Sequence, residues 1–203
     1  MQNNVNLEII IATHGFVLNR IEKEELRRDM QFEIKFIDVQ KEVSLGNCLN
    51  ICIQMSKNPI IAKMDDDDYY AKNYLFNQWC ALQYSGAEVV RKYDTLIHFE
   101  EGDIIARRHS GFYYHFNDFI MGATLMCKSE LLKKLCFNDL WQSEDSDLLK
   151  RIKINGSKIF VNHPFDFCVF RHHNNNLHTW KVSNIALLKN SRIIGYGKPY
   201  KYI

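Results

Sequence analysis

The sequence predicts an α/β fold, in which strands and helices alternate from residue 7 to the acidic run at residues 65–68. Two observations carry this prediction. Three short segments rich in apolar residues, at residues 7–12, 32–39 and 60–64, have the character of strands. Two segments with helical spacing separate them, and such alternation is typical of a parallel sheet with helices on both faces. A chain of 203 residues, 46% of them hydrophobic, suits a single domain with a sizeable core.

The first predicted strand is the near-continuous apolar run at residues 7–12, and it ends at the polar turn Thr13-His14-Gly15. A charged helix is expected over residues 18–30. The second strand, residues 32–39, alternates in polarity and ends near Asp38. A helix over residues 45–52 follows, with Ser44 as its N-cap.

The third predicted strand stops at four consecutive aspartates, Asp65 to Asp68. Four adjacent carboxylates repel one another, so a compensating cation is expected, and Mg²⁺ binds through one or two carboxylates plus substrate phosphates. Ligands of open α/β sheets bind outside the carboxyl ends of the strands. We therefore expect a metal–diphosphate site here, and a solvated acidic turn is the alternative. Lys63, just before the aspartates, either screens them or faces away.

The rest of the chain predicts further short elements. Helices are expected at residues 74–85, 129–135, 145–154 and 181–191, and strands at residues 87–90, 95–99, 104–106, 121–127, 158–161 and 167–170. The three strands between residues 87 and 106 favour β-hairpins. The polar segment between Arg171 and His178 suits a lid over a ligand, or else an ordinary polar surface loop.

Composition excludes several classes of protein. The formal net charge of +2 gives no excess that would point to nucleic acid. None of the six cysteines forms a CxxC pair, which favours a reducing compartment. The first residues lack a signal-peptide pattern, and no window approaches eighteen apolar residues. We expect a cytoplasmic protein, and peripheral contact with the inner face of the membrane stays open.

Four motifs occur in a fixed order: Thr13-His14-Gly15, Asp65-x-Asp67, Gly122-Ala123-Thr124 and Glu144-Asp145. Together they resemble the GT-A glycosyltransferases of the family 2 type, which are inverting and nucleotide-sugar dependent. The resemblance covers about residues 5–180. It implies one GT-A domain over residues 1–203, with a mixed central sheet. The nucleotide-sugar half would span about residues 1–100 and the acceptor half about residues 101–203.

The resemblance also implies a role for each donor-side residue. Thr13 and His14 match the turn that meets the uracil and the ribose. Asp38 matches the acid that contacts the base, although the usual Asp-Asp-Gly-Ser is absent there. Asp65 would lie towards the ribose, with Asp66 beside it as a supporting residue.

The resemblance also implies roles on the metal and acceptor sides. Asp67 matches the ligand of a Mn²⁺ or Mg²⁺ ion, and His178 and Arg171 are candidates for the diphosphate side, with His178 placed at the metal. Asp145 matches the general base. Glu144 would bind the acceptor, together with Gly122.

The resemblance implies transfer of a sugar, from a UDP-sugar in our expectation, to a hydroxyl acceptor in bacterial surface polysaccharide or glycoconjugate synthesis. A saccharide, a lipid-linked oligosaccharide, a wall polymer or a protein could each be the acceptor. A nucleotidyltransferase of the same general fold is one alternative, although the glycine-rich basic loop that it would need is absent. A non-catalytic relative that binds sugar nucleotides is another.

Overall fold

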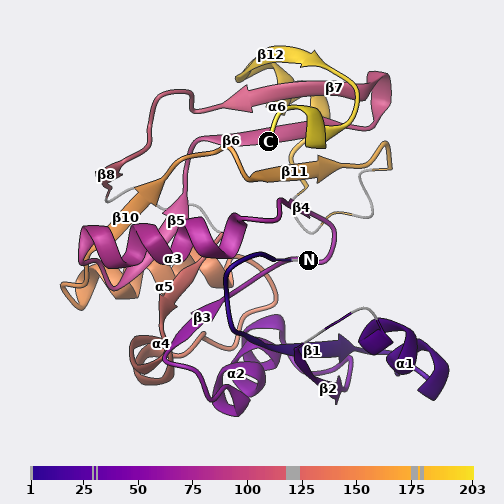
Figure 1. Ribbon diagram of the computed structural model, residues 1–203, viewed down its shortest axis with the longest axis vertical. Coiled ribbons are helices and arrows are strands. Elements are labelled where there is room, and N and C mark those ends of the chain that lie inside the picture. The colour runs from indigo at the N-terminus through magenta and orange to yellow at the C-terminus, as the bar shows by residue number, and fades with distance from the viewer. Residues whose placement is uncertain (1, 29, 31, 118–123, 175–177, 179–180) are drawn as a thin grey trace.

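The computed structural model describes residues 1–203 except residues 1, 29, 31, 118–123, 175–177 and 179–180. Strands and helices alternate along most of the chain, as Figure 1 shows. The strands are β1 (Glu8–His14), β2 (Glu33–Val39), β3 (Ile60–Ala62), β4 (Tyr69–Tyr70), β5 (Val89–Lys92), β6 (Thr95–Phe99), β7 (Ile104–Arg108), β8 (His115–Phe116), β9 (Met126–Lys128), β10 (Ile159–Asn162), β11 (Phe167–Arg171) and β12 (Ser191–Tyr196). The α-helices are α1 (Arg20–Arg28), α2 (Leu45–Met55), α3 (Tyr74–Ser85), α4 (Ser129–Leu135), α5 (Glu144–Ile154) and α6 (Asn184–Lys189), and short 3-10 turns are formed by Glu101–Asp103 and Pro199–Lys201.

The strands form three sheets. β1 and β2 are a parallel pair, drawn at the bottom of Figure 1. The middle sheet has the order β3-β9-β5-β10-β8, and the upper sheet has the order β12-β7-β6-β11-β4. Both five-stranded sheets are mixed, because β5 and β10 run parallel, as do β6 and β11, while their other pairings are antiparallel. The predicted mixed α/β fold is confirmed.

Helices cover both faces of the middle sheet. On one face, α4 and α5 bury Leu132, Leu148 and Ile152 against β5, β9 and β10. On the other face, α3 packs Ala81 and Leu82 against these strands, and Figure 1 shows α3 crossing in front of β5 and β10. The apolar spacing of these helices in the sequence thus corresponds to the faces that they bury.

Most predicted elements lie where expected. α2 begins after Ser44, whose hydroxyl accepts a hydrogen bond from the Asn47 N–H at 3.3 Å. Helix α3 ends at Gly86, whose φ of 65° is left-handed. Strands β6 and β7 form the expected hairpin.

Three expectations about strands and helices were wrong. β3 does not extend the parallel pair but lies in the middle sheet, where it pairs antiparallel with β9 from the other half of the chain. β5 forms no hairpin with β6 and instead lies between β9 and β10. The last predicted helix covers only Asn184–Lys189, because the chain turns at Asn190 and continues as strand β12. Among the described residues, no helix is both long and apolar enough to cross a membrane.

Candidate functional site

The carboxyl ends of β1 and β2 bring Thr13 and Asp38 together. The parallel register pairs these two residues directly. Thr13 is buried, and its hydroxyl donates a hydrogen bond to Oδ1 of Asp38 at 2.9 Å. Oδ2 of Asp38 lies 3.6 Å from the ammonium of Lys23 on α1. The carboxylate predicted to contact the base is therefore held by the threonine of the predicted uracil turn.

His14, the next residue, connects this end of β1 to the start of α5. Its Nε2 lies 2.7 Å from the carbonyl oxygen of Val43, so Nε2 donates to that oxygen. The imidazole lies beside the indole of Trp141, with 6.1 Å between ring centroids. Trp141 is 54% exposed and precedes α5 by a few residues. Two segments that the sequence assigned to opposite halves of the domain thus meet at this contact.

The four aspartates have different surroundings. The backbone N–H of Asp65 donates to the Tyr70 hydroxyl at 2.8 Å. Oδ1 of Asp68 accepts from the backbone N–H of Phe170 on β11 at 3.0 Å, and burial raises the pKa of Asp68 to about 7. Asp66 is exposed. Asp68 therefore holds the aspartate turn against the upper sheet. Asp65 and Asp67 remain as the carboxylates that could meet a donor on the predicted donor side.

The ammonium of Lys63 contacts acids that the sequence predicts for the donor side and for the acceptor side. Its Nζ lies 2.8 Å from Oδ2 of Asp145, 3.0 Å from Oδ1 of Asp65 and 4.0 Å from Oε1 of Glu144. Lys63 therefore faces the aspartates, and the alternative that it points away is excluded. Side chains at i and i+2 of an extended segment lie on the same side, so the spacing of Lys63 and Asp65 was the signal available in the sequence.

Helix α5 is fixed so that its first turn presents Glu144 and Asp145 to Lys63. Arg151, near the other end of α5, pairs with Asp147 and donates hydrogen bonds at 2.6 and 2.8 Å to the carbonyl groups that end α4. Burial, helped by the neighbouring charge of Asp145, raises the pKa of Glu144. The positive end of the helix dipole stabilises carboxylates at this position.

Asp67 lies beside His178, which comes from the late polar segment. Oδ2 of Asp67 is 3.9 Å from Nδ1 of His178. Nε2 of His178 accepts a hydrogen bond from the His172 N–H at 2.9 Å. Burial lowers the pKa of His178, so the ring is neutral at pH 7. With Nε2 as acceptor, the ring proton is on Nδ1 and points towards Asp67.

Of this pair, Asp67 is the residue that could contact a divalent cation as the side chains stand. Among the residues that the structure describes, no three His, Cys, Asp or Glu side chains converge on one point. Asp67 is 44% exposed at its side chain, so its oxygens are accessible to an ion that also takes diphosphate oxygens. His178 could ligate through Nδ1 only after its proton moves to Nε2 and the bond from His172 breaks. Its metal role, like that of Asp67, stays a prediction.

Arg171 lies at the end of β11, close to the aspartate turn, and is buried. Its guanidinium donates to the side-chain oxygen of Asn184 at 3.0 Å and to the carbonyl of Val182 at 2.6 Å. Burial lowers the pKa of Arg171, and the charges of Asp67 and Asp68 oppose that shift. Arg171 thus ties β11 to the start of α6, and its contact with a donor stays a prediction.

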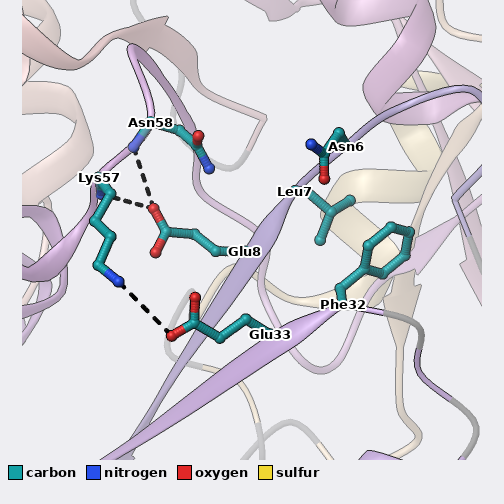
Figure 2. A pocket seen from close by; sticks show the side chains of 7 residues that line it. All are labelled: Asn6, Leu7, Glu8, Phe32, Glu33, Lys57 and Asn58. Carbon is teal, nitrogen blue, oxygen red and sulfur yellow. Dashed lines mark hydrogen bonds and ion pairs between the residues drawn. The ribbon is translucent and has the colours of Figure 1, made fainter.

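Gly122, predicted for the acceptor side, lies outside the described residues. A separate hollow of about 250 Å³ lies at the amino ends of β1 and β2, the ends opposite Thr13 and Asp38 (Figure 2). Its polar groups pair with one another: Glu8 accepts hydrogen bonds from the backbones of Lys57 and Asn58, and Glu33 pairs with Lys57. The hollow therefore has no part in the candidate site.

Comparison of the sequence with protein-family models and with curated proteins finds no match. Solved structures do match. S. aureus TarS 1–349 in complex with UDP-GlcNAc superposes with a TM-score of 0.64 at 14% identity, over 90% of this chain and 55% of that one. The same fragment with UDP gives 0.61 at 13% identity, over 83% and 53%, and the longer TarS structure gives 0.62 at 14% identity, over 83% and 32%. The mixed α/β fold of this chain is therefore similar to the fold of these TarS structures. This chain spans about half of the TarS fragment that it matches.

Proposed function

We propose that this protein transfers a sugar from a UDP-sugar to a hydroxyl group of an acceptor. The observation that carries the proposal is the single ammonium of Lys63, which contacts Asp65 on the donor side and Asp145 on the acceptor side. Such a transfer needs a donor and an acceptor that meet at one point, and two acidic centres with different surroundings. The TarS structures with UDP and UDP-GlcNAc support a nucleotide sugar as the donor.

On the acceptor side, Asp145 takes the proton of the attacking hydroxyl as that oxygen bonds to the anomeric carbon. A positioned carboxylate contributes about 10²–10⁴-fold in such a step. Glu144, buried in the same turn of α5, positions the acceptor. Gly122 belongs to this side in the family 2 resemblance.

On the donor side, Thr13, His14 and Asp38 hold the uridine, and Asp65 meets the ribose with Asp66 beside it. Asp67 holds Mn²⁺ or Mg²⁺, which supplies positive charge to the leaving diphosphate when bound. These assignments follow the family 2 resemblance and agree with the contact between Thr13 and Asp38. In this proposal the protein acts in the cytoplasm, in bacterial surface polysaccharide or glycoconjugate synthesis.

A hydrolysis and transfer screen over a panel of nucleotide sugars with Mn²⁺ tests the proposal. We expect turnover of at least one UDP-sugar, lost in Asp145→Asn while UDP still binds, and lost in Asp67→Asn together with metal-dependent UDP binding. Asp139→Asn is the matched control, because Asp139 is exposed and lies outside the site. The absence of metal-dependent nucleotide binding in calorimetry would refute the proposal.

Two other outcomes of these measurements would support the alternative functions. Preferential binding of a nucleoside triphosphate would favour a nucleotidyltransferase. Tight UDP-sugar binding without turnover, for every acceptor class tried, would favour a non-catalytic relative.

A further inference from the structure

The backbone at Lys63 is fixed next to the middle sheet. Lys63 directly follows β3, and its N–H donates to the carbonyl of Leu125 at 2.9 Å. The side chain is 12% exposed. Its ammonium therefore sits in a defined place between the aspartate turn and α5, and solvent screens its interactions less than those of a surface lysine.

Lys63 remains charged in this environment. Burial by itself favours the neutral amine, but the carboxylates of Asp145 and Asp65 outweigh burial and hold the pKa of Lys63 above its usual range. Arg91 on β5 also interacts with the charge of Asp145, and burial lowers the pKa of Arg91 to about 10, so it is charged at pH 7. Among the residues that the structure describes, the charges of Lys63, Arg91, Asp65 and Glu144 thus act on Asp145.

We propose that Lys63 is a positioning residue of the transfer reaction, which holds the Asp145 carboxylate in place at the acceptor and ties it to the donor-side Asp65. The inference rests on the proposed function above. Lys63 contacts both carboxylates with one ammonium, so the general base and the residue expected at the ribose are kept in a fixed relation before either substrate arrives. Preorganisation of this kind lowers the barrier because no group has to move into place during the reaction.

Two substitutions of Lys63, one that removes the charge and one that keeps it, distinguish a positioning role from a role in folding. Lys63→Met removes the charge and keeps the apolar stem, and we expect kcat to fall about 10²-fold, the lower end of what a positioned base contributes. Lys63→Arg keeps the charge, and we expect it to restore kcat to within about tenfold of the wild type, since the planar guanidinium does not reproduce the ammonium geometry.

Lys35→Met is the matched control. Lys35 forms a partly buried ion pair with Glu8, away from the carboxyl ends of β1 and β2, so this variant loses a comparable pair without touching the site. We expect Lys35→Met to melt earlier but to keep the wild-type kcat. If Lys63→Met keeps kcat within about threefold, or if Lys63→Arg fails to restore the kcat that Lys63→Met loses, the inference is wrong although the proposed function stands. If the wild type turns over no nucleotide sugar, the proposed function itself fails.

Discussion

Oδ2 of Asp67 lies 3.9 Å from Nδ1 of His178, and the backbone N–H of His172 fixes the other nitrogen of that ring. The aspartate turn after β3 and the polar segment after β11 therefore meet on the predicted diphosphate side. The two segments are far apart in the sequence, and they are held together because Asp68 bonds to the backbone of β11. His178 accepts at Nε2, whereas a metal-bound histidine usually donates its other ring N–H, so a role in orienting Asp67 fits this geometry better than direct ligation.

His178→Ala tests this contact. Whether the ring ligates the metal or orients Asp67, we expect the Mn²⁺-dependent affinity for UDP to fall about 10–100-fold, the range typical of such supporting partners. Titration calorimetry with UDP, with and without Mn²⁺, measures the change. His173→Ala is the control, since His173 is exposed and pairs with Glu101 away from the aspartates. Equal UDP affinity in wild type and His178→Ala would remove His178 from the site.

Thr13→Val tests the uridine end of the site. The substitution keeps the shape of the side chain but removes the hydrogen bond to Asp38, and a bond to a charged group contributes about 1.5 kcal/mol or more. We expect the Kd for UDP to rise about tenfold, which corresponds to about 1.4 kcal/mol. The same change at Thr95, on β6 of the upper sheet, should leave UDP binding unaltered. An unchanged Kd in Thr13→Val would show that Asp38 does not need Thr13 to meet the base.

The spacing of apolar and polar residues within single segments correctly predicted the strand and the helix next to the site. The apolar run that ends at Thr13 and the helix that begins at Glu144 both follow from side-chain spacing within one segment. The pairing of the strands could not be predicted in this way. A segment's tendency to form a strand does not indicate which distant segment it will pair with. β3 is only three residues long, and its partner β9 comes from the other half of the chain.

The missed final strand has a similar cause. β12 is stabilised by its pairing with β7 and by the Tyr202 hydroxyl, which bonds to the backbone of Tyr196 at 2.9 Å. A Cβ at Gly195 would lie 2.1 Å from that hydroxyl, so the glycine is required by a contact that only the folded chain contains. No periodicity within residues 191–196 reveals such a contact.

Gly46→Ala tests whether the close packing of α2 against the segment before Trp141 stabilises the fold. A Cβ at Gly46 would lie 2.0 Å from the carbonyl oxygen of Asn138, and the Gly46 N–H donates to the carbonyl of Leu140 at 3.0 Å. Both contacts are to backbone atoms, so the segment before Trp141 must shift. We expect a loss of about 1–3 kcal/mol in the free energy of unfolding, measured by urea denaturation. Gln54→Ala, on the exposed side of the same helix, should cost less than about 0.5 kcal/mol. An unchanged unfolding free energy in Gly46→Ala would mean that the segment yields without strain.

Glu8 predicts how stability depends on acid pH. Its hydrogen bond from Lys35 and those from the Lys57 and Asn58 backbones outweigh burial and lower the pKa of Glu8 below its ordinary value of 4.5. A lowered carboxyl pKa stabilises the fold above the unfolded value, and this contribution is lost as pH falls through the folded value. The stability that Glu8 contributes is therefore lost as the pH falls below about 4.5.

We expect Glu8→Gln to lower the urea midpoint at pH 7. In this variant we also expect a smaller further loss of stability between pH 5 and pH 3 than in the wild type. Glu25→Gln, a change on the exposed helix α1, supplies the control. Parallel pH curves for wild type and Glu8→Gln would contradict the expectation, because they would show that Glu8 takes up its proton equally in the folded and unfolded chains.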